Sequence, residues 1–296
     1  MTQLTTGNLV SGGVNNLIGA GNLFTTGNVF YVDSVRGSNG NVGTDPALPL
    51  ATISAAQTAA TASNRDVVVV KPSHAETITS AGGIALSKAG VSYIALGQGS
   101  YRPTVTFGTA TTATMTISGA NVVIDNFVFT QSFDAIVSPI VISGAGCVIA
   151  DSYFMTANAS YQATQMILTT AGASNLVISG NRFIGTADAG TTAAITLVGG
   201  DNANISDNDF IGAYSSAVGA IQATGTLVTN CVIARNTIVN RTASSTKGIT
   251  LLTGSTGIIR DNRFGIGSGA APITADACWW NGNYSSAAVA TNGTLV

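Results

Sequence analysis

The stretch Asn175-Leu176-Val177-Ile178-Ser179-Gly180-Asn181-Arg182-Phe183 decides how this chain folds, because its pattern recurs along the sequence. Six copies are found, at residues 121–129, 146–154, 175–183, 202–210, 230–238 and 256–264. The central isoleucine of each copy defines position 0, and it is Ile124, Ile149, Ile178, Ile205, Ile233 and Ile259. Successive copies are 25 to 29 residues apart. A repeat of this length predicts one structural unit stacked on itself.

Each copy has the composition of a β-strand, with Val, Ile and Phe in short runs between Gly, Asn and Ser. Positions 0 and +5 are apolar in every copy, although residues five apart in one strand point to opposite faces. The chain therefore turns a corner between them. At position +3, four copies carry the asparagines Asn181, Asn208, Asn236 and Asn262. Asparagine tolerates the left-handed backbone of a tight corner, and stacked asparagines form hydrogen-bonded ladders, so we expect these four to form the corner.

A second short strand, with an apolar–x–apolar pattern, precedes each copy, as in Ile140-Val141-Ile142 and Ile195-Thr196-Leu197. Three strand segments and three corners then make one coil of a parallel β-solenoid. We predict an all-β fold, a single right-handed parallel β-helix of about nine coils, on the order of 40 Å long. The sequence lacks the leucine–asparagine signature of a leucine-rich repeat, and its repeats are shorter than the about 40 residues of a propeller blade.

The predicted solenoid spans residues 67–284, with a lead-in segment at 33–66 and a C-terminal tail at 285–296. Residues 49–62 predict a short helix that caps the first coil. Trp279 and Trp280 lie in a degenerate last copy, where they plug the core or form a platform for stacking sugars.

Residues 1–32 carry no charged side chain and are rich in Gly, Asn, Thr and Leu. We expect an extended arm that docks on a partner or on sister subunits. Its partner-binding residues would be the apolar ones, Leu4, Leu9, Val10, Leu17, Ile18, Leu23 and Phe24. The alternative is a strand that folds back on the chain's own solenoid.

Charged residues make up 8% of the chain and the net charge is −2, so no nucleic-acid footprint is expected. Neither a membrane span nor a secretory signal is evident. Two of the three cysteines, Cys147 and Cys231, lie two residues before position 0, in the inward register of the core. A disulfide between them is excluded if the coils stack as predicted.

Cleavage of acidic polysaccharides needs grouped carboxylates, and the charges of the repeat favour ion pairs instead. At position +2, the last three copies read Asp207, Arg235 and Asp261. Asp207 and Asp209 share a strand and are candidates for a calcium site, but Arg235 is a next-coil neighbour. His74 is expected to be structural. We therefore predict no catalytic residues, no metal site, no cofactor and no enzymatic activity.

The segment Phe30-Tyr31-Val32-Asp33-Ser34, the Gly/Asn loop 37–43 and Pro49-Leu50-Ala51-Thr52-Ile53 resemble the N-terminal segment of pectate-lyase-like β-helices in bacteriophage virion proteins. Residues 72–78 and 101–108 are also similar to that group. The resemblance implies a homotrimer on the outer surface of a virion. Its partners would be the major capsid protein or other virion proteins, without nucleic acid or membrane.

Within that group, the short chain and its dispersed acids favour a structural role. We expect a trimeric capsid decoration (cement) protein that stabilises the head through its N-terminal arm. The alternative is a tail-associated spike that binds or cleaves a host surface glycan.

Overall fold

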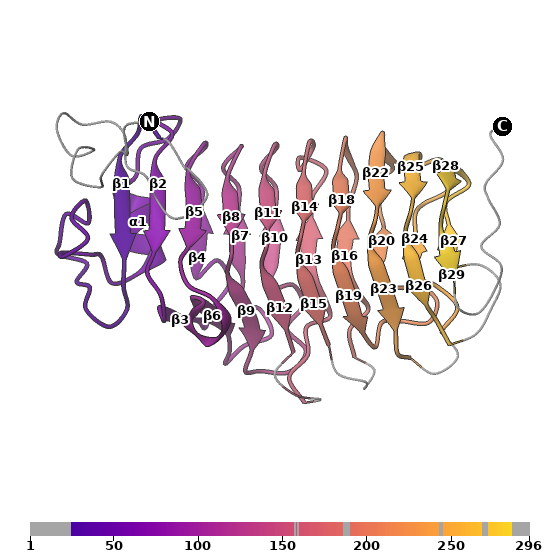
Figure 1. Ribbon diagram of the computed structural model, residues 1–296, viewed down its shortest axis with the longest axis horizontal. Coiled ribbons are helices and arrows are strands. Elements are labelled where there is room, and N and C mark those ends of the chain that lie inside the picture. Colours follow the sequence, from indigo (N-terminus) through magenta and orange to yellow (C-terminus); the bar gives the residue numbers. More distant parts are fainter. Residues whose placement is uncertain are drawn as a thin grey trace, which may run out of the picture.

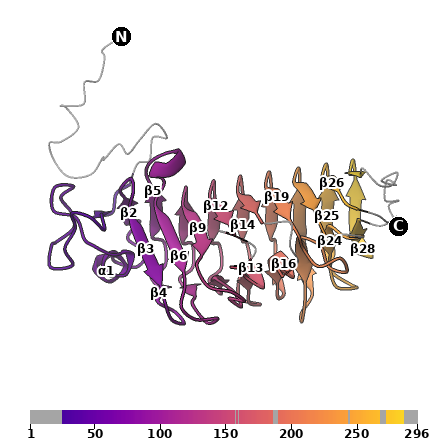
Figure 2. The ribbon, with the colours of Figure 1, turned by 90° about the horizontal axis from the view of Figure 1, so that it is seen from below.

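The computed structural model describes residues 25–156, 158, 160–185, 190–242, 245–267 and 272–285. Figure 1 shows strands stacked along the long axis of the molecule in the order of the sequence. Figure 2 shows the same stack from below, and the coils follow one another without a break between domains.

Three long parallel sheets form the walls of the solenoid, and we call them sheets I, II and III in the order in which each coil visits them. Sheet I has ten strands: β1 (Val29–Val32), β2 (Val67–Val70), β5 (Ser92–Ala95), β8 (Val123–Asp125), β11 (Val148–Ala150), β14 (Val177–Ser179), β18 (Asn204–Ser206), β22 (Cys231–Ala234), β25 (Thr256–Arg260) and β28 (Ala277–Asn281).

Sheet II has nine strands: β3 (Ala75–Ile78), β6 (Thr104–Phe107), β9 (Val128–Gln131), β12 (Tyr153–Met155), β15 (Arg182–Ile184), β19 (Asp209–Gly212), β23 (Thr237–Asn240), β26 (Arg263–Gly265) and β29 (Tyr284–Ser285). Sheet III has eight: β4 (Ile84–Leu86), β7 (Met115–Ile117), β10 (Ile140–Ile142), β13 (Gln165–Thr169), β16 (Ala193–Leu197), β20 (Ile221–Ala223), β24 (Ile249–Thr250) and β27 (Ile273–Thr274). A separate pair is β17 (Gly200–Asp201) with β21 (Val228–Thr229).

The predicted fold class is confirmed, since the chain is an all-β, right-handed parallel β-solenoid. Every strand pair in the three sheets is parallel, and the central isoleucines pair in one continuous column from Ile124 to Ile259. The predicted number of coils was slightly too high. Among the described residues, eight coils contain a strand from each of the three sheets, because sheet III has eight strands.

The tight corner between sheets I and II lies one residue earlier than the sequence predicts. Positive φ angles occur at position +2, as in Asn126, Asp151, Asp207 and Arg235, and not at the asparagines of position +3. The assignment of the left-handed conformation to Asn181, Asn208, Asn236 and Asn262 was therefore wrong. The residue at position +2 adopts the left-handed conformation. The side chain of the asparagine that follows it, at position +3, is buried inside the solenoid.

The asparagines of position +3 form a buried column, Asn181, Asn208, Asn236, Asn262 and Asn283. The backbone N–H and the side-chain Nδ2 of Asn208 both donate to Oδ1 of Asn236, each at 3.0 Å. Its Nδ2 also donates to the carbonyls of Ile178 and Ser206 at 2.9 Å. The same pattern continues through Asn262 to Asn283, so each amide satisfies backbone groups that the corner removes from the sheets.

Phenylalanines at position +5 stack along the inside of sheet II. The ring centroids of Phe154 and Phe183 are 4.4 Å apart, and those of Phe183 and Phe210 are 4.7 Å apart. Mostly aliphatic side chains, many of them isoleucines from sheets I and III, fill the rest of the interior. Cys147 and Cys231 are buried and free, as their inward register predicts.

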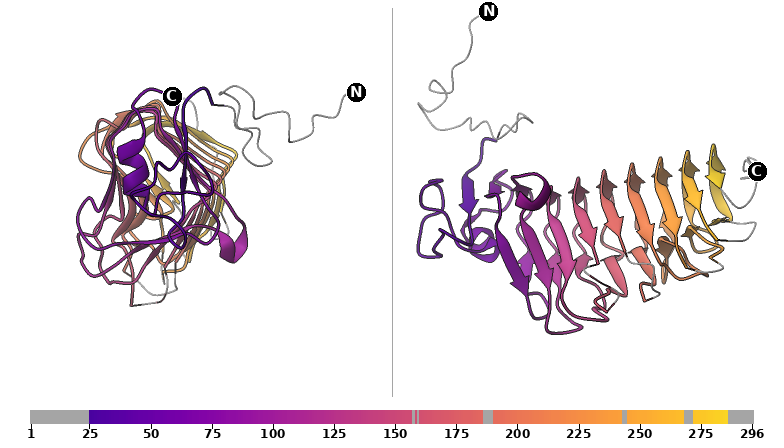
Figure 3. Two further views of the ribbon diagram at one scale, coloured as in Figure 1. Left: turned by 90° about the vertical axis from the view of Figure 1, so that its left-hand side faces the viewer. Right: turned by 60° about the horizontal axis from the view of Figure 1, so that its bottom comes forward.

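The helix α1 (Ile53–Ala59) lies across the N-terminal end of the stack, where it contacts β1, β2 and β4 (Figure 3). Thr52 caps this helix by accepting a hydrogen bond from Ala55 N–H at 3.1 Å. The sequence assigned residues 29–32 to the arm. In the structure they form β1 and pair with β2, so this part of the chain follows the alternative interpretation, a strand folded back on the solenoid. The remaining arm candidates, Leu4 to Phe24, lie outside the described residues.

Candidate interaction surface and charged clusters

The outward face of sheet I carries a column of apolar side chains at position −1. Because side chains alternate along a strand, the residues beside the buried central isoleucines point outward. This column contains Val123, Val148, Val177, Val232, Ile258 and Trp279, interrupted by Asn204. These side chains are half-buried by their neighbours, except Ile258, which is 37% exposed. Contiguous apolar surface of this kind marks contact sites in soluble proteins.

Charged side chains are scarce on this face. From β5 to β28, the strands of sheet I contain two charged residues, Asp125 and Arg260, and both lie in the outward column at position +1. The β1 end of the face is already covered. Val29, Val67 and Val69 form a second buried apolar cluster there, with Tyr31 packed against it.

The predicted ion pair between Asp207 and Arg235 on neighbouring coils is present at the corner, and a second pair between neighbouring coils lies on sheet II. Arg235 Nε and Nη2 donate to the two carboxylate oxygens of Asp207 at 2.7 and 2.6 Å. Arg182 Nε lies 3.5 Å from Asp209 Oδ2. The hydrogen bonds from Arg235 hold the pKa of Asp207 below its ordinary value. Asp261 differs, since its closest cation is Arg260 on its own coil, at 3.1 Å.

A second charged cluster escaped the prediction from sequence. The guanidinium carbon of Arg102 lies 4.1 Å from the ring centroid of Tyr153, and that of Arg182 lies 5.5 Å from it. Arg102 also donates to the backbone carbonyl of Asp151 at 2.9 Å. Burial first, and the charge of Asp151 second, raise the pKa of Asp125, and Arg102 opposes this shift.

The sequence contains a signal for this cluster. Asp125 is at position +1 of the first copy and Asp151 is at position +2 of the second, so adjacent coils bring the two carboxylates to one corner. Gly180 follows in the next coil, and a Cβ atom there would lie 2.3 Å from Asp151 Oδ1. Arg102 lies outside the repeats, in the loop after the short 3-10 helix η3 (Gly99–Tyr101), so the alignment of copies could not place it.

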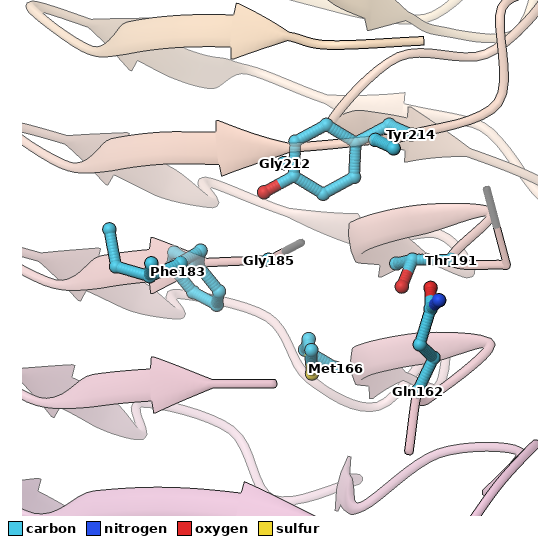
Figure 4. Close-up of a pocket in the computed structure, with 9 residues that line it drawn as sticks. Gln162, Met166, Phe183, Gly185, Thr191, Gly212 and Tyr214 are labelled. Atoms are coloured by element: carbon cyan, nitrogen blue, oxygen red, sulfur yellow. The ribbon is translucent and has the colours of Figure 1, made fainter. Parts of the chain in front are cut away.

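One small cavity lies between the ends of sheets II and III (Figure 4). Its lining is formed by Gln162, Met166, Phe183, Ile184, Gly185, Thr191, Gly212, Ala213 and Tyr214. It has room for about one water molecule. Tyr214 is buried beside it, and this burial raises the pKa of the phenol. The cavity is too small to hold a sugar residue.

His74 is buried and lies 3.3 Å from Glu76, whose Oε2 also accepts the N–H of Ile53 at the start of α1. This histidine belongs to the N-terminal cap. Among the described residues, no group of three or more His, Cys, Asp or Glu side chains could hold a metal ion. No helix in the described part of the chain combines the length and hydropathy needed to cross a bilayer.

No family model matches this chain, and no curated protein matches it. Two solved structures are similar in shape. A rhamnogalacturonan lyase matches with a TM-score of 0.48 and 16% identity, over 88% of this chain and 73% of that one. Pectate lyase Pel9A matches with a TM-score of 0.39 and 15% identity, over 85% of this chain and 78% of that one.

These comparisons contradict one expectation from the sequence. The chain was expected not to be an enzyme, but both similar structures are polysaccharide lyases, so that expectation was wrong as stated. At 15–16% identity the likeness concerns the fold, and it assigns no reaction to this chain. The structure itself shows a parallel β-solenoid.

Proposed function

We propose that this chain is a structural subunit on the outer surface of a bacteriophage particle, a capsid decoration (cement) protein. The observation that carries the proposal is the outward apolar column of sheet I, from Val123 to Trp279. A contiguous apolar face of this kind is often a functional contact site, and a subunit of an assembly would bury it. The resemblance of residues 30–53 to virion β-helices supplies the kind of assembly.

In this proposal the partner is the major capsid protein, and the part of the predicted arm that precedes β1 docks on it. Residues 1–24 precede a chain that is anchored in sheet I from β1 onward. The homotrimer implied by the resemblance stays a prediction.

The test is to image, at side-chain resolution, particles of the virus whose genome encodes this chain. We expect density for the solenoid at many equivalent positions on the head. Particles carrying a chain shortened by residues 1–24 should lose that density and break open at lower temperature. A few copies restricted to the tail, or no copies on purified particles, would contradict the proposal.

The charged cluster favours a second candidate function, binding or cleavage of a surface glycan. Asp125 and Asp151 provide two carboxyl groups, and Arg102 and Arg182 provide guanidinium donors on the same outer surface. Two neighbouring carboxyl groups, one of them with a raised pKa, are the pairing that glycosidic-bond cleavage uses. Tyr101, 65% exposed and next to Arg102, offers a ring for stacking on a sugar.

A panel of host polysaccharides separates the two functions. If the second holds, the chain is retained by one polysaccharide in affinity electrophoresis, and Arg102→Ala weakens retention by about tenfold. Release of reducing ends or unsaturated sugars would then depend on Asp125 and Asp151. Asp207→Asn is the matched control for Asp151→Asn, because both residues occupy position +2 with positive φ. Absence of both retention and release across the panel would exclude this function for those glycans.

A further inference from the structure

The order of charges and side-chain sizes along the outward face of sheet I points to its occupant. After β1 and β2, whose outward valines are already covered, eight of the ten strands remain, from β5 to β28. The middle of this set lies between β14 and β18. We propose that the face binds a second copy of this chain, turned so that the two solenoids run antiparallel.

The required operation is a two-fold axis that lies between the two faces, parallel to the strands, and crosses them between β14 and β18. Such an axis keeps each residue's place along its strand and reverses the order of the coils. It sets β14 against β18 of the second copy, β11 against β22, β8 against β25 and β5 against β28. A contact of this kind is isologous, so one surface serves both copies.

The two charges of the face are complementary under this operation. Asp125 on β8 and Arg260 on β25 share the column at position +1, through Ala150, Ser179, Ser206 and Ala234. In the antiparallel pair, Asp125 of each copy faces Arg260 of the other. Within its own chain, Asp125 faces Asp151 and Arg102, and Arg260 contacts Asp261.

Arrangements that keep the two chains parallel place like charges together. A two-fold or three-fold axis along the solenoid brings each coil to the height of the same coil in its neighbour. Asp125 would then lie level with Asp125, and Arg260 with Arg260. Like charges opposed across an interface cost affinity, so the parallel arrangements are disfavoured. This distinguishes the inference from the homotrimer that the resemblance implies.

Side-chain sizes at position −1 also match under the antiparallel operation. The largest side chain of the column, Trp279 on β28, meets the smallest, Ser92 on β5. Val123 meets Ile258, Val148 meets Val232, and Val177 meets Asn204. Large against small across facing sheets is the pattern of well-packed β-sandwiches.

The size of the face sets the strength to expect. Eight strands at about 4.8 Å spacing and about 13 Å of strand length give on the order of 500 Å² per copy. The total of roughly 1,000 Å² is at the lower limit for a specific interface. We therefore expect a reversible dimer with a dissociation constant in the micromolar range.

Sedimentation equilibrium of the full-length chain tests the self-association. We expect a shift from 29.6 kDa to twice that mass as the concentration rises through the micromolar range. Val148→Lys should weaken the dimer at least 30-fold. Val141→Lys is the matched control, because Val141 is a half-buried outward valine of β10 on sheet III, and it should leave the mass unchanged.

Charge reversal tests the direction. Asp125→Arg and Arg260→Asp should each weaken the dimer about tenfold, and the double variant should restore it, because each reversed charge faces the other reversed charge. In a parallel arrangement each of these residues lies level with its own copy, so like charges stay opposed in the double variant and it does not bind more tightly than the single variants. Spin labels on Ser92→Cys should be about 34 Å apart in the antiparallel dimer, seven strand spacings.

A monomer at every concentration, a trimer, no rescue by the double variant, or labels within about 15 Å would each overturn the inference. The inference and the proposed function share the premise that this face is an interface, but their tests are independent. Circular dichroism of each variant checks that the solenoid is intact. A monomer that still decorates particles would refute the inference alone, and a dimer that is absent from particles would refute the proposed function alone.

Discussion

At the scale of single residues, the asparagine column stabilises the corner between sheets I and II. Asn208→Ala removes the acceptor used by the N–H and Nδ2 of Asn181, at 2.9 and 3.1 Å, and the donor used by two buried carbonyls. Each buried polar group left unpaired costs about 1–3 kcal/mol. We expect Asn208→Ala to lower the free energy of unfolding by about 3–5 kcal/mol, measured by urea denaturation.

The control for that prediction is Asn204→Ala, in the same coil. Asn204 is half-buried on the outward side of β18, and its Oδ1 is buried without a hydrogen-bond partner among the described residues. Because that oxygen accepts no hydrogen bond from the described residues, its replacement should not lower the free energy of unfolding. Equal losses for the two variants would show that the column contributes no more than an outward amide.

Two carboxylates at the same corner should respond to pH in opposite ways. The pKa of Asp207 is lowered by Arg235, so this pair stabilises the fold above pH 3.8 and the contribution is lost as the pH falls through the folded-state pKa. The pKa of Asp125 is raised, mainly by burial, so its ionised form costs stability at pH 7 and the cost disappears as the pH falls through the raised pKa.

Melting temperatures of two asparagine variants check these signs. At pH 7, Asp207→Asn should lower the midpoint by about 1–3 °C, as expected for an exposed ion pair. At concentrations where the chain is monomeric, Asp125→Asn should raise it by about 1–2 °C at pH 7. Both differences should shrink towards pH 3. Destabilisation by Asp125→Asn at pH 7 would mean that the carboxylate is held by a favourable contact.

At the scale of elements, the phenylalanine stack joins the coils along sheet II. Phe183 lies between Phe154 and Phe210 and is almost fully buried. Phe183→Ala should cost about 3–5 kcal/mol, since it leaves a cavity between stacked rings. The control is Tyr153→Ala on the outward side of neighbouring β12, which should cost about 1 kcal/mol or less, by loss of its contact with Arg102. Chemical denaturation of both variants measures the difference.

The periodic part of these elements could be predicted from the sequence, because one interior imposes the same apolar positions on every coil. The isoleucine column, the phenylalanine positions and the Arg235–Asp207 pair all follow from the alignment of copies. The left-handed residue was misplaced because several residue types, among them Asp151, Gly180 and Arg235, occupy position +2 and leave no residue signature.

The aperiodic part could not be predicted in this way. Arg102 reaches the corner from a loop that has no counterpart in the other copies, so its stack on Tyr153 depends on tertiary structure. The outward valines of sheet I were visible in the sequence as position −1. That they form one continuous surface depends on the register between strands, which aligns them in one column.

At the scale of the whole molecule, a solenoid has no contacts between distant coils, so its stability is a sum over neighbours. Among the described residues, the last coil pairs with one other coil, through β28 and β25. Its position 0 is Trp280, which pairs with Ile259 and is packed, partly buried, on the end of the core. The indole therefore covers apolar surface that a further coil would otherwise bury, which agrees with a plug.

Hydrogen exchange of Trp280→Ala tests both the plug and the neighbour rule. We expect amide protection in β28 and β25 to fall by about 10- to 100-fold, because the last coils open locally when their cover is removed. Protection in β11 and β14, several coils away, should stay within about twofold of the parent chain, since no contact carries the loss that far. The outward neighbour Trp279→Ala serves as the control, and at concentrations where the chain is monomeric it should leave β25 unchanged. A uniform loss of protection along the stack would mean that the solenoid unfolds as one cooperative unit, and the cover at its end would then stabilise every coil alike.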